Sequence, residues 1–101
     1  MMWVVKLHKS EEGNILVVSD EELVGEKFEE KGRQLDLDSD FYKGERKDEE
    51  EIKKLIQKLD FKILHLTGKR TINLFKDWID KEKILKVEGV LHAEVYLEKE
   101  S

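Results

Sequence analysis

Two adjacent cations, Lys69 and Arg70, directly follow Thr67 and Gly68 and precede Thr71. They fall in the first turn of an expected helix, where the helix dipole favours anions rather than cations. The free N–H groups of such a turn, together with the two cations, would hold a phosphate or a carboxylate. The alternative is that acidic side chains of the same chain neutralise both cations. The sequence leaves both interpretations open.

The three histidines, His8, His65 and His92, form the second group with chemical potential. They fall on three expected strands and would meet only if these strands were neighbours, in which case Glu94 would join them. No recognised metal-ligand spacing is present. The acidic run 36–40 also lacks the Gly and Glu that a calcium loop needs at its sixth and twelfth positions. We therefore expect no metal and no cofactor, and we place His65 and His92 near the anion-binding turn.

Motifs of common enzymes are missing from the sequence. The Gly68-Lys69 pair resembles the end of a P-loop, but that motif needs Gly at the position of Ile63 and Ser or Thr at the position of Arg70. No serine lies in a G-x-S-x-G elbow. The absence of cysteine excludes a disulfide framework and a thiolate zinc site. The sequence thus favours a binding protein over an enzyme and leaves a small enzyme as an open alternative.

The turn must be positioned by the strand before it and the helix after it. Residues 61–66 form a short apolar run typical of a buried strand. Thr67 is expected to cap the helix, and Gly68 to allow the sharp turn. The helix is expected to continue to about residue 81, with Ile72, Phe75 and Ile79 on its buried side.

The rest of the chain supplies further strands and helices. Apolar alternation predicts strands at 3–8, 15–18, 33–38, 84–87 and 90–97. Ser19 and Glu22 fit a capping box for a short helical turn, and Asp48 is expected to cap a helix that ends near Leu59. That helix would connect strand 33–38 to strand 61–66 as a parallel crossover. We predict an α/β (α+β) fold, a mixed sheet of about five strands with two or three helices packed mainly on one face.

Composition bounds the class of protein. The 101 residues are expected to form one domain, 1–101, and no apolar run is long enough to span a membrane. The N-terminus lacks the features of a signal peptide, so we expect a cytoplasmic protein. Charged residues reach 43%, mostly Glu and Lys, which favours a thermophilic source. The net charge is −5, yet in residues 62–86 seven bases stand against three acids, which predicts a basic face on an acidic body.

Several motifs together are similar to an archaeal family, domain of unknown function 424. They are W-V-V-K-L-H, S-D-E-E-L-V-G-E-K-F-E-E, D-F-Y-K-G-E, L-T-G-K-R and V-E-G-V-L-H-A-E-V, and the resemblance extends from Met1 to about Leu97. It implies a small, stand-alone, cytosolic α/β protein and no particular activity. Two positions depart from the family pattern: Leu91 stands where Pro is expected, and Ser19 where Cys is frequent.

Three functions are compatible with these observations. The first is a non-catalytic module that contacts RNA or a ribonucleoprotein through the basic strand, turn and helix. The second is a subunit that binds a protein partner through an exposed strand edge or the Phe41-Tyr42 turn. The third is a small enzyme or sensor that holds a phosphorylated metabolite at the Thr67–Thr71 turn. We favour the first. The oligomeric state does not follow from the sequence.

Overall fold

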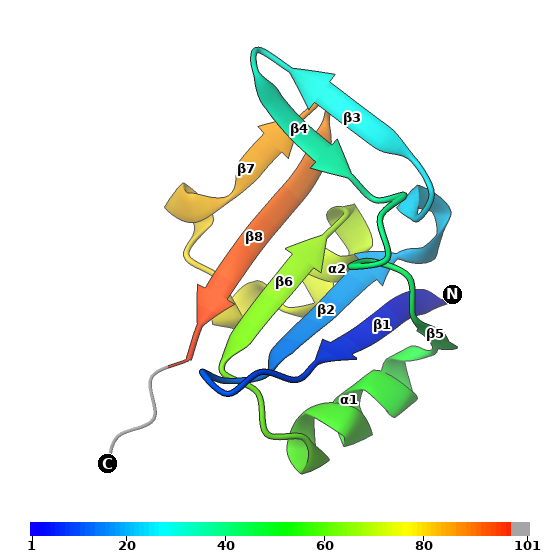
Figure 1. Ribbon diagram of the computed structural model, residues 1–101, viewed down its shortest axis with the longest axis vertical. Coiled ribbons are helices and arrows are strands. Elements are labelled where there is room, and N and C mark those ends of the chain that lie inside the picture. Colours follow the sequence, from blue (N-terminus) through cyan, green and yellow to red (C-terminus); the bar gives the residue numbers. More distant parts are fainter. Residues whose placement is uncertain (98–101) are drawn as a thin grey trace.

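Six strands form one mixed β-sheet in the computed structural model, which describes residues 1–97 (Figure 1). The strand order is β5-β1-β2-β6-β8-β7. Their bounds are β1 Trp3–His8, β2 Ile15–Asp20, β5 Glu45–Lys47, β6 Ile63–Thr67, β7 Leu85–Val87 and β8 Val90–Tyr96. Only β2 and β6 pair in parallel within this sheet; the other neighbours are antiparallel. The parallel pair places the carboxyl ends of β2 and β6 at the same edge of the sheet.

Two α-helices cover one face of the sheet. Helix α1 (Glu49–Lys58) begins with the expected capping box, in which Asp48 and Glu51 bond each other's backbone N–H groups. Helix α2 (Lys69–Leu74) follows β6 directly. Both helices bury apolar side chains against the alternate residues of the central strands, which form the main core. The prediction of an α+β domain with a mixed sheet is thereby confirmed. No helix within residues 1–97 has the length and apolar character needed to cross a membrane.

A hairpin of β3 (Lys27–Glu30) and β4 (Arg33–Asp36) stands apart from the main sheet. In Figure 1 it lies at the end of the molecule, over the ends of β7 and β8. Leu35, Leu37 and Val87 form a second, smaller core that joins it to the sheet. The predicted helical crossover would have left strand 33–38 parallel to strand 61–66. This pairing is wrong, because the strand parallel to β6 is β2, and within residues 1–97 β4 pairs only with β3 of the hairpin.

Two helical predictions need correction. The helix predicted for 69–81 ends at Leu74, because Phe75 leaves the helical region (φ −108°, ψ 20°) and short 3-10 turns follow at Lys76–Trp78 and Lys81–Lys83. The predicted Ser19 capping box is also wrong, because β2 continues through Ser19 to Asp20 and a 3-10 turn, Glu21–Leu23, begins only after it.

The segment after β4 covers part of the other face of the sheet. Phe41 and Tyr42 are partly buried there and turn inward rather than outward. Gly44 allows the chain to return close to β1, since a Cβ at this position would overlap the backbone carbonyl of Val5. The two faces of the sheet thus differ: one carries the helices and the main core, and the other carries polar side chains beneath a loop.

Candidate functional site

The start of α2 is occupied by a carboxylate of the protein itself. Asp20 ends β2, which lies parallel to β6, so its side chain reaches the turn that follows β6. Its Oδ2 accepts a hydrogen bond from the N–H of Arg70 (3.1 Å). Its Oδ1 accepts from the N–H of Thr71 (2.8 Å) and from the Thr71 hydroxyl (2.7 Å). Asp20 is 4% exposed, so these bonds form away from water. The carboxylate therefore stands where an external anion would otherwise bind the helix.

Gly68 makes this arrangement possible. It occupies the N-cap position with φ +105°, a conformation that side-chain-bearing residues rarely adopt. A Cβ at Gly68 would also overlap the Asp20 carboxylate. The expectation that Thr67 caps the helix was wrong, because its hydroxyl bonds His92 instead and Asp20 takes over the capping role from another strand.

Arg70 is held by internal contacts. Its guanidinium makes two hydrogen bonds to the Glu22 carboxylate, and Nη2 also donates to the carbonyl oxygen of Met2 (3.0 Å). The group lies over the ring of Trp3, 4.9 Å from its centroid, which is a cation–π contact. The hydrogen bonds between Glu22 and Arg70 lower the pKa of the Glu22 carboxyl group and raise the pKa of the Arg70 guanidinium. Of the two interpretations of the cation pair, internal neutralisation describes Arg70.

Lys69 points into a different environment. It is exposed and lines an open groove of about 330 Å³ between α2, the following 3-10 turns and β8. The groove has an apolar floor and three lysines along its rim. Its lining residues are Lys69, Ile72, Asn73, Lys76, Ile79, Lys81, Ile84 and Leu91. We call this feature the lysine-rimmed groove. Within residues 1–97, its three lysines make no ion pair with a carboxylate.

His65 and His92 lie together on the other face of the sheet. β6 and β8 are antiparallel neighbours, and in their register His65 stands opposite Glu94 and Thr67 opposite His92. The Thr67 hydroxyl oxygen and His92 Nδ1 are 2.8 Å apart, both buried. Glu94 Oε1 lies 3.7 Å from His65 Nε2 and 4.0 Å from His92 Nε2. We call His65, His92 and Glu94 the histidine–carboxylate cluster.

Burial dominates the protonation of this cluster. It lowers the pKa of His65, against the opposing effect of Glu94. It also lowers the pKa of His92, and the neighbouring His65 adds to this effect. Burial and the nearby Glu94 raise the pKa of Tyr42, which is part of the covering loop. Both imidazoles are therefore neutral near pH 7, the form in which a ring nitrogen can bind a metal.

His8 remains outside the cluster. Its Nε2 lies 2.9 Å from the carbonyl oxygen of Phe41, and its ring stacks on the Phe41 ring with centroids 4.5 Å apart. Phe41 in turn meets the His65 ring edge-on at 5.1 Å. The structure thus brings two of the three histidines together with Glu94 and leaves the third at the end of β1, against the loop that covers them.

The predicted site residues therefore separate into two places. Thr67, His65 and His92 lie on the loop-covered face, while Gly68, Lys69, Arg70 and Thr71 lie at the carboxyl edge and on the helix-covered face. Sequence reasoning missed Asp20, which occupies the turn. The available signal was an acidic residue, Asp20, directly after a continuous apolar run that predicts a buried strand.

These features define a small α+β domain with a lysine-rimmed groove on one face of its sheet and a histidine–carboxylate cluster on the other. The chain belongs to the DUF424 family, described as proteins of unknown function, whose pattern matches residues 8–97. This confirms the resemblance found in the sequence motifs.

One solved structure has a closely similar fold, a crystal structure described as that of an uncharacterized conserved protein from Methanopyrus kandleri. It superimposes with a TM-score of 0.78 over 100% of this chain and 96% of that chain, at 22% sequence identity. At this identity the likeness concerns the fold alone. The comparison with curated proteins gives no match.

Proposed function

We propose that the protein is a non-catalytic binding module that takes single-stranded RNA, free or within a ribonucleoprotein, into the lysine-rimmed groove. The observation that supports this most directly is the rim itself. Lys69, Lys76 and Lys81 are exposed around an apolar floor, and no carboxylate of residues 1–97 pairs with them. Unpaired ammonium groups are free to contact phosphates.

The groove also offers surface for bases and sugars. Four aliphatic residues form its floor: Ile72, Ile79, Ile84 and Leu91. Proteins that bind single strands combine a cationic track with apolar or aromatic surfaces on which bases stack. Arg70 contributes nothing to this surface, because it is already bound to Glu22. The proposed contact is thus shifted from the turn to the groove beside it.

The net charge sets the strength of such binding. At −5 the molecule as a whole repels a polyanion, so attraction is confined to this face and weakens as salt screens it. For three lysine–phosphate contacts to a single strand, affinity should fall about 20-fold between 50 and 200 mM salt.

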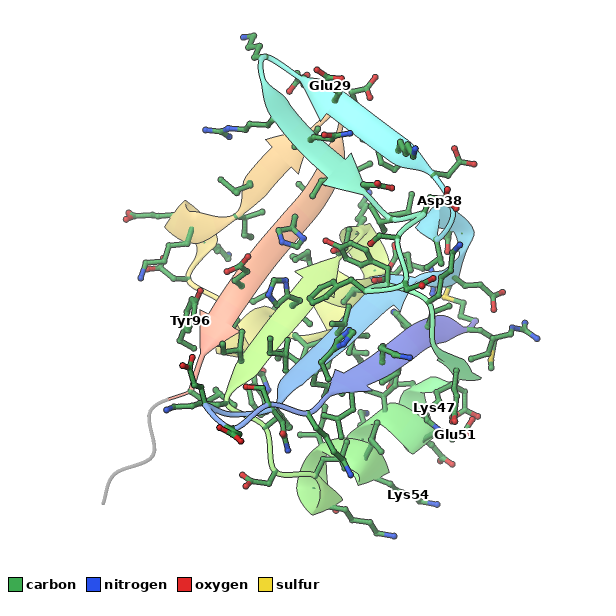
Figure 2. All side chains as sticks on the ribbon, in the orientation of Figure 1. Glu29, Asp38, Lys47, Glu51, Lys54 and Tyr96 are labelled. Carbon is green, nitrogen blue, oxygen red and sulfur yellow. The ribbon has the colours of Figure 1, made fainter. Side chains whose placement is uncertain are left out.

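The test is fluorescence anisotropy with a labelled single-stranded RNA of mixed sequence. The variant Lys69→Ala/Lys76→Ala/Lys81→Ala should weaken binding at least about tenfold at low salt. The control is Lys9→Ala/Lys54→Ala/Lys58→Ala, which removes the same charge from exposed positions outside the groove. In Figure 2, Lys54 projects from α1 toward solvent. Circular dichroism checks that both variants fold.

Two results would contradict the proposal. One is undetectable RNA binding by the wild type at 50 mM salt. The other is an equal loss of affinity in both triple variants, which would assign binding to net charge rather than to the groove. A polyglutamate competitor that displaces RNA at equal charge concentration would instead favour an acidic protein partner at the same groove.

A further inference from the structure

The antiparallel pairing of β6 with β8 brings together three side chains that are typical metal ligands. His65 stands directly opposite Glu94, and His92 lies two residues before Glu94 on the same face of β8. One ligand atom from each of the three lies within 4.8 Å of the other two. Both Nε2 atoms approach the same carboxylate oxygen, Glu94 Oε1, at 3.7 and 4.0 Å.

We propose that His65, His92 and Glu94 bind a divalent first-row transition-metal ion, and that Zn²⁺ is the ion that best fits this donor set. Two imidazole nitrogens and one carboxylate oxygen are ligands that Zn²⁺ takes readily, whereas Mg²⁺ and Ca²⁺ are held by oxygen atoms. Three protein ligands leave the fourth position of a tetrahedral ion to water or another small ligand. The proposal departs from the expectation drawn from sequence, where no metal spacing was found.

The distances permit such a site after a small adjustment. Bonds of about 2.0–2.1 Å to a tetrahedral Zn²⁺ place the donor atoms about 3.3–3.4 Å apart. The observed separations from Glu94 Oε1 are 3.7 and 4.0 Å. The Glu94 side chain is 40% exposed and sits at the open side of the cluster, so it can move toward both imidazoles without disturbing the core. The ligand nitrogens of the two histidines lie within 4.8 Å of each other, so the imidazoles must also move closer together when the ion binds.

Groups outside the cluster already orient two of the ligands. Thr67 Oγ1 and His92 Nδ1 share a hydrogen bond, and when the Nδ1–H donates to the hydroxyl oxygen, the lone pair of Nε2 is free and faces Glu94. The Tyr96 hydroxyl donates to Glu94 Oε2 (2.9 Å), which leaves Oε1 directed toward the histidines. Tyr96 is seen at the end of β8 in Figure 2. Hydrogen bonds of this kind fix the tautomer and direction of metal ligands.

The third ligand, His65, lacks such a partner. Its Nδ1 is buried without a hydrogen bond to any group in residues 1–97, and its Nε2 meets only the Glu94 oxygen at 3.7 Å, beyond hydrogen-bond distance. Buried polar nitrogens are nearly always satisfied, so an exception calls for an explanation. Coordination through Nε2 would give this imidazole one strong polar contact, while Nδ1 would stay without a partner among residues 1–97.

The proposal is tested with untagged protein that has been freed of metal by a chelator. Titration with Zn²⁺ by calorimetry should give one ion per chain, and Co²⁺ should produce the intense visible absorption of a low-coordinate site. Glu94→Gln and His92→Gln should each weaken Zn²⁺ binding at least about tenfold. Thr67→Val, which removes only the hydrogen bond to His92, should weaken it about 10- to 100-fold.

His8→Gln is the matched control, because it removes a neighbouring histidine whose Nε2 is already engaged with Phe41. It should keep the affinity and stoichiometry of the wild type. Because Glu94 is partly exposed, Glu94→Gln keeps the measurement valid even if His92→Gln fails to fold. Absence of one-to-one binding, unchanged affinity in Glu94→Gln, or an equal loss in His8→Gln would overturn the proposal.

Discussion

Asp20 is expected to be a strong determinant of stability, although it lies outside both apolar cores. It accepts three hydrogen bonds from the first turn of α2 while 4% exposed. Hydrogen bonds to a charged acceptor each contribute about 1.5–3 kcal/mol. In Asp20→Asn the amide oxygen can keep the two bonds to Thr71, but the amide nitrogen then faces the N–H of Arg70. The expected loss in the free energy of unfolding is about 2–3 kcal/mol.

This loss can be measured by guanidinium unfolding followed through tryptophan fluorescence, since Trp3 packs beneath Arg70. In a domain of this size the loss corresponds to a decrease in Tm of about 10–20 °C. Asp40→Asn is the control, because it removes the same charge from an exposed position. Thr71→Val removes one of the three bonds, and its coupling energy with Asp20→Asn should be at least about 0.5 kcal/mol, because a neutral amide oxygen accepts the Thr71 hydroxyl bond more weakly than the carboxylate does.

Two outcomes would refute the reasoning. If Asp20→Asn lay within about 0.5 kcal/mol of Asp40→Asn, the carboxylate would not be holding the helix start, since surface substitutions stay within that range. If the two substitutions at 20 and 71 were additive, the observed hydrogen bonds would not be the source of the effect. Either result would reopen the turn as a site for an external anion.

The remaining predictions concern backbone strain, pH and the second core. Gly68→Ala should destabilise the protein by at least about 2 kcal/mol more than Gly25→Ala in thermal unfolding, because both have positive φ but only Gly68 would overlap Asp20. In metal-free buffer, the free energy of unfolding should fall as the pH drops below about 6.5, since burial lowers the pKa of His92 in the folded state and the unfolded chain then binds more protons. His92→Gln should reduce this decrease between pH 8 and 5; an unchanged profile would contradict the burial argument. Leu37→Ala should cost about 2–4 kcal/mol and accelerate hydrogen exchange in β3 and β4, and unaltered exchange there would mean that the second core does not hold the hairpin.

Local sequence patterns predicted where the strands and helices lie better than they predicted which strands pair with each other. Alternation identified β1 and β8, and the acidic first turn after Asp48 identified α1, because both signals arise within a few residues. The parallel pairing of β2 with β6 joins residues almost fifty positions apart and leaves no local trace. The apolar residues after Leu74 kept helical spacing, yet Phe75 is 1% exposed while Trp78 is 41% exposed. Packing over the core, rather than helical period, decided where α2 ends.

Site residues that lie on the same strand could be grouped from the sequence, whereas residues that meet through strand pairing could not. Alternation alone placed His92 and Glu94 on one face of β8, and the structure adds His65 because β6 is the neighbouring strand. Asp20 was hidden by the Ser19–Glu22 pattern, which fits a capping box in sequence but forms none, since Ser19 is in β2 and Glu22 binds Arg70. Charge patterning pointed to the segment 62–86 but could not tell Arg70, which is paired with Glu22, from Lys69, Lys76 and Lys81, which line the groove.

The two proposed sites lie back to back on one strand, which makes their tests independent. Successive residues of a strand point to opposite faces, so Leu91 lines the lysine-rimmed groove while His92 belongs to the histidine–carboxylate cluster. The lysine triple variant should therefore keep the Zn²⁺ affinity of the wild type, and Glu94→Gln should keep its RNA affinity. If instead metal binding changed RNA affinity, the coupling would have to pass through β8 and be reciprocal. Measuring RNA binding with and without saturating Zn²⁺ distinguishes two separate sites from one linked system.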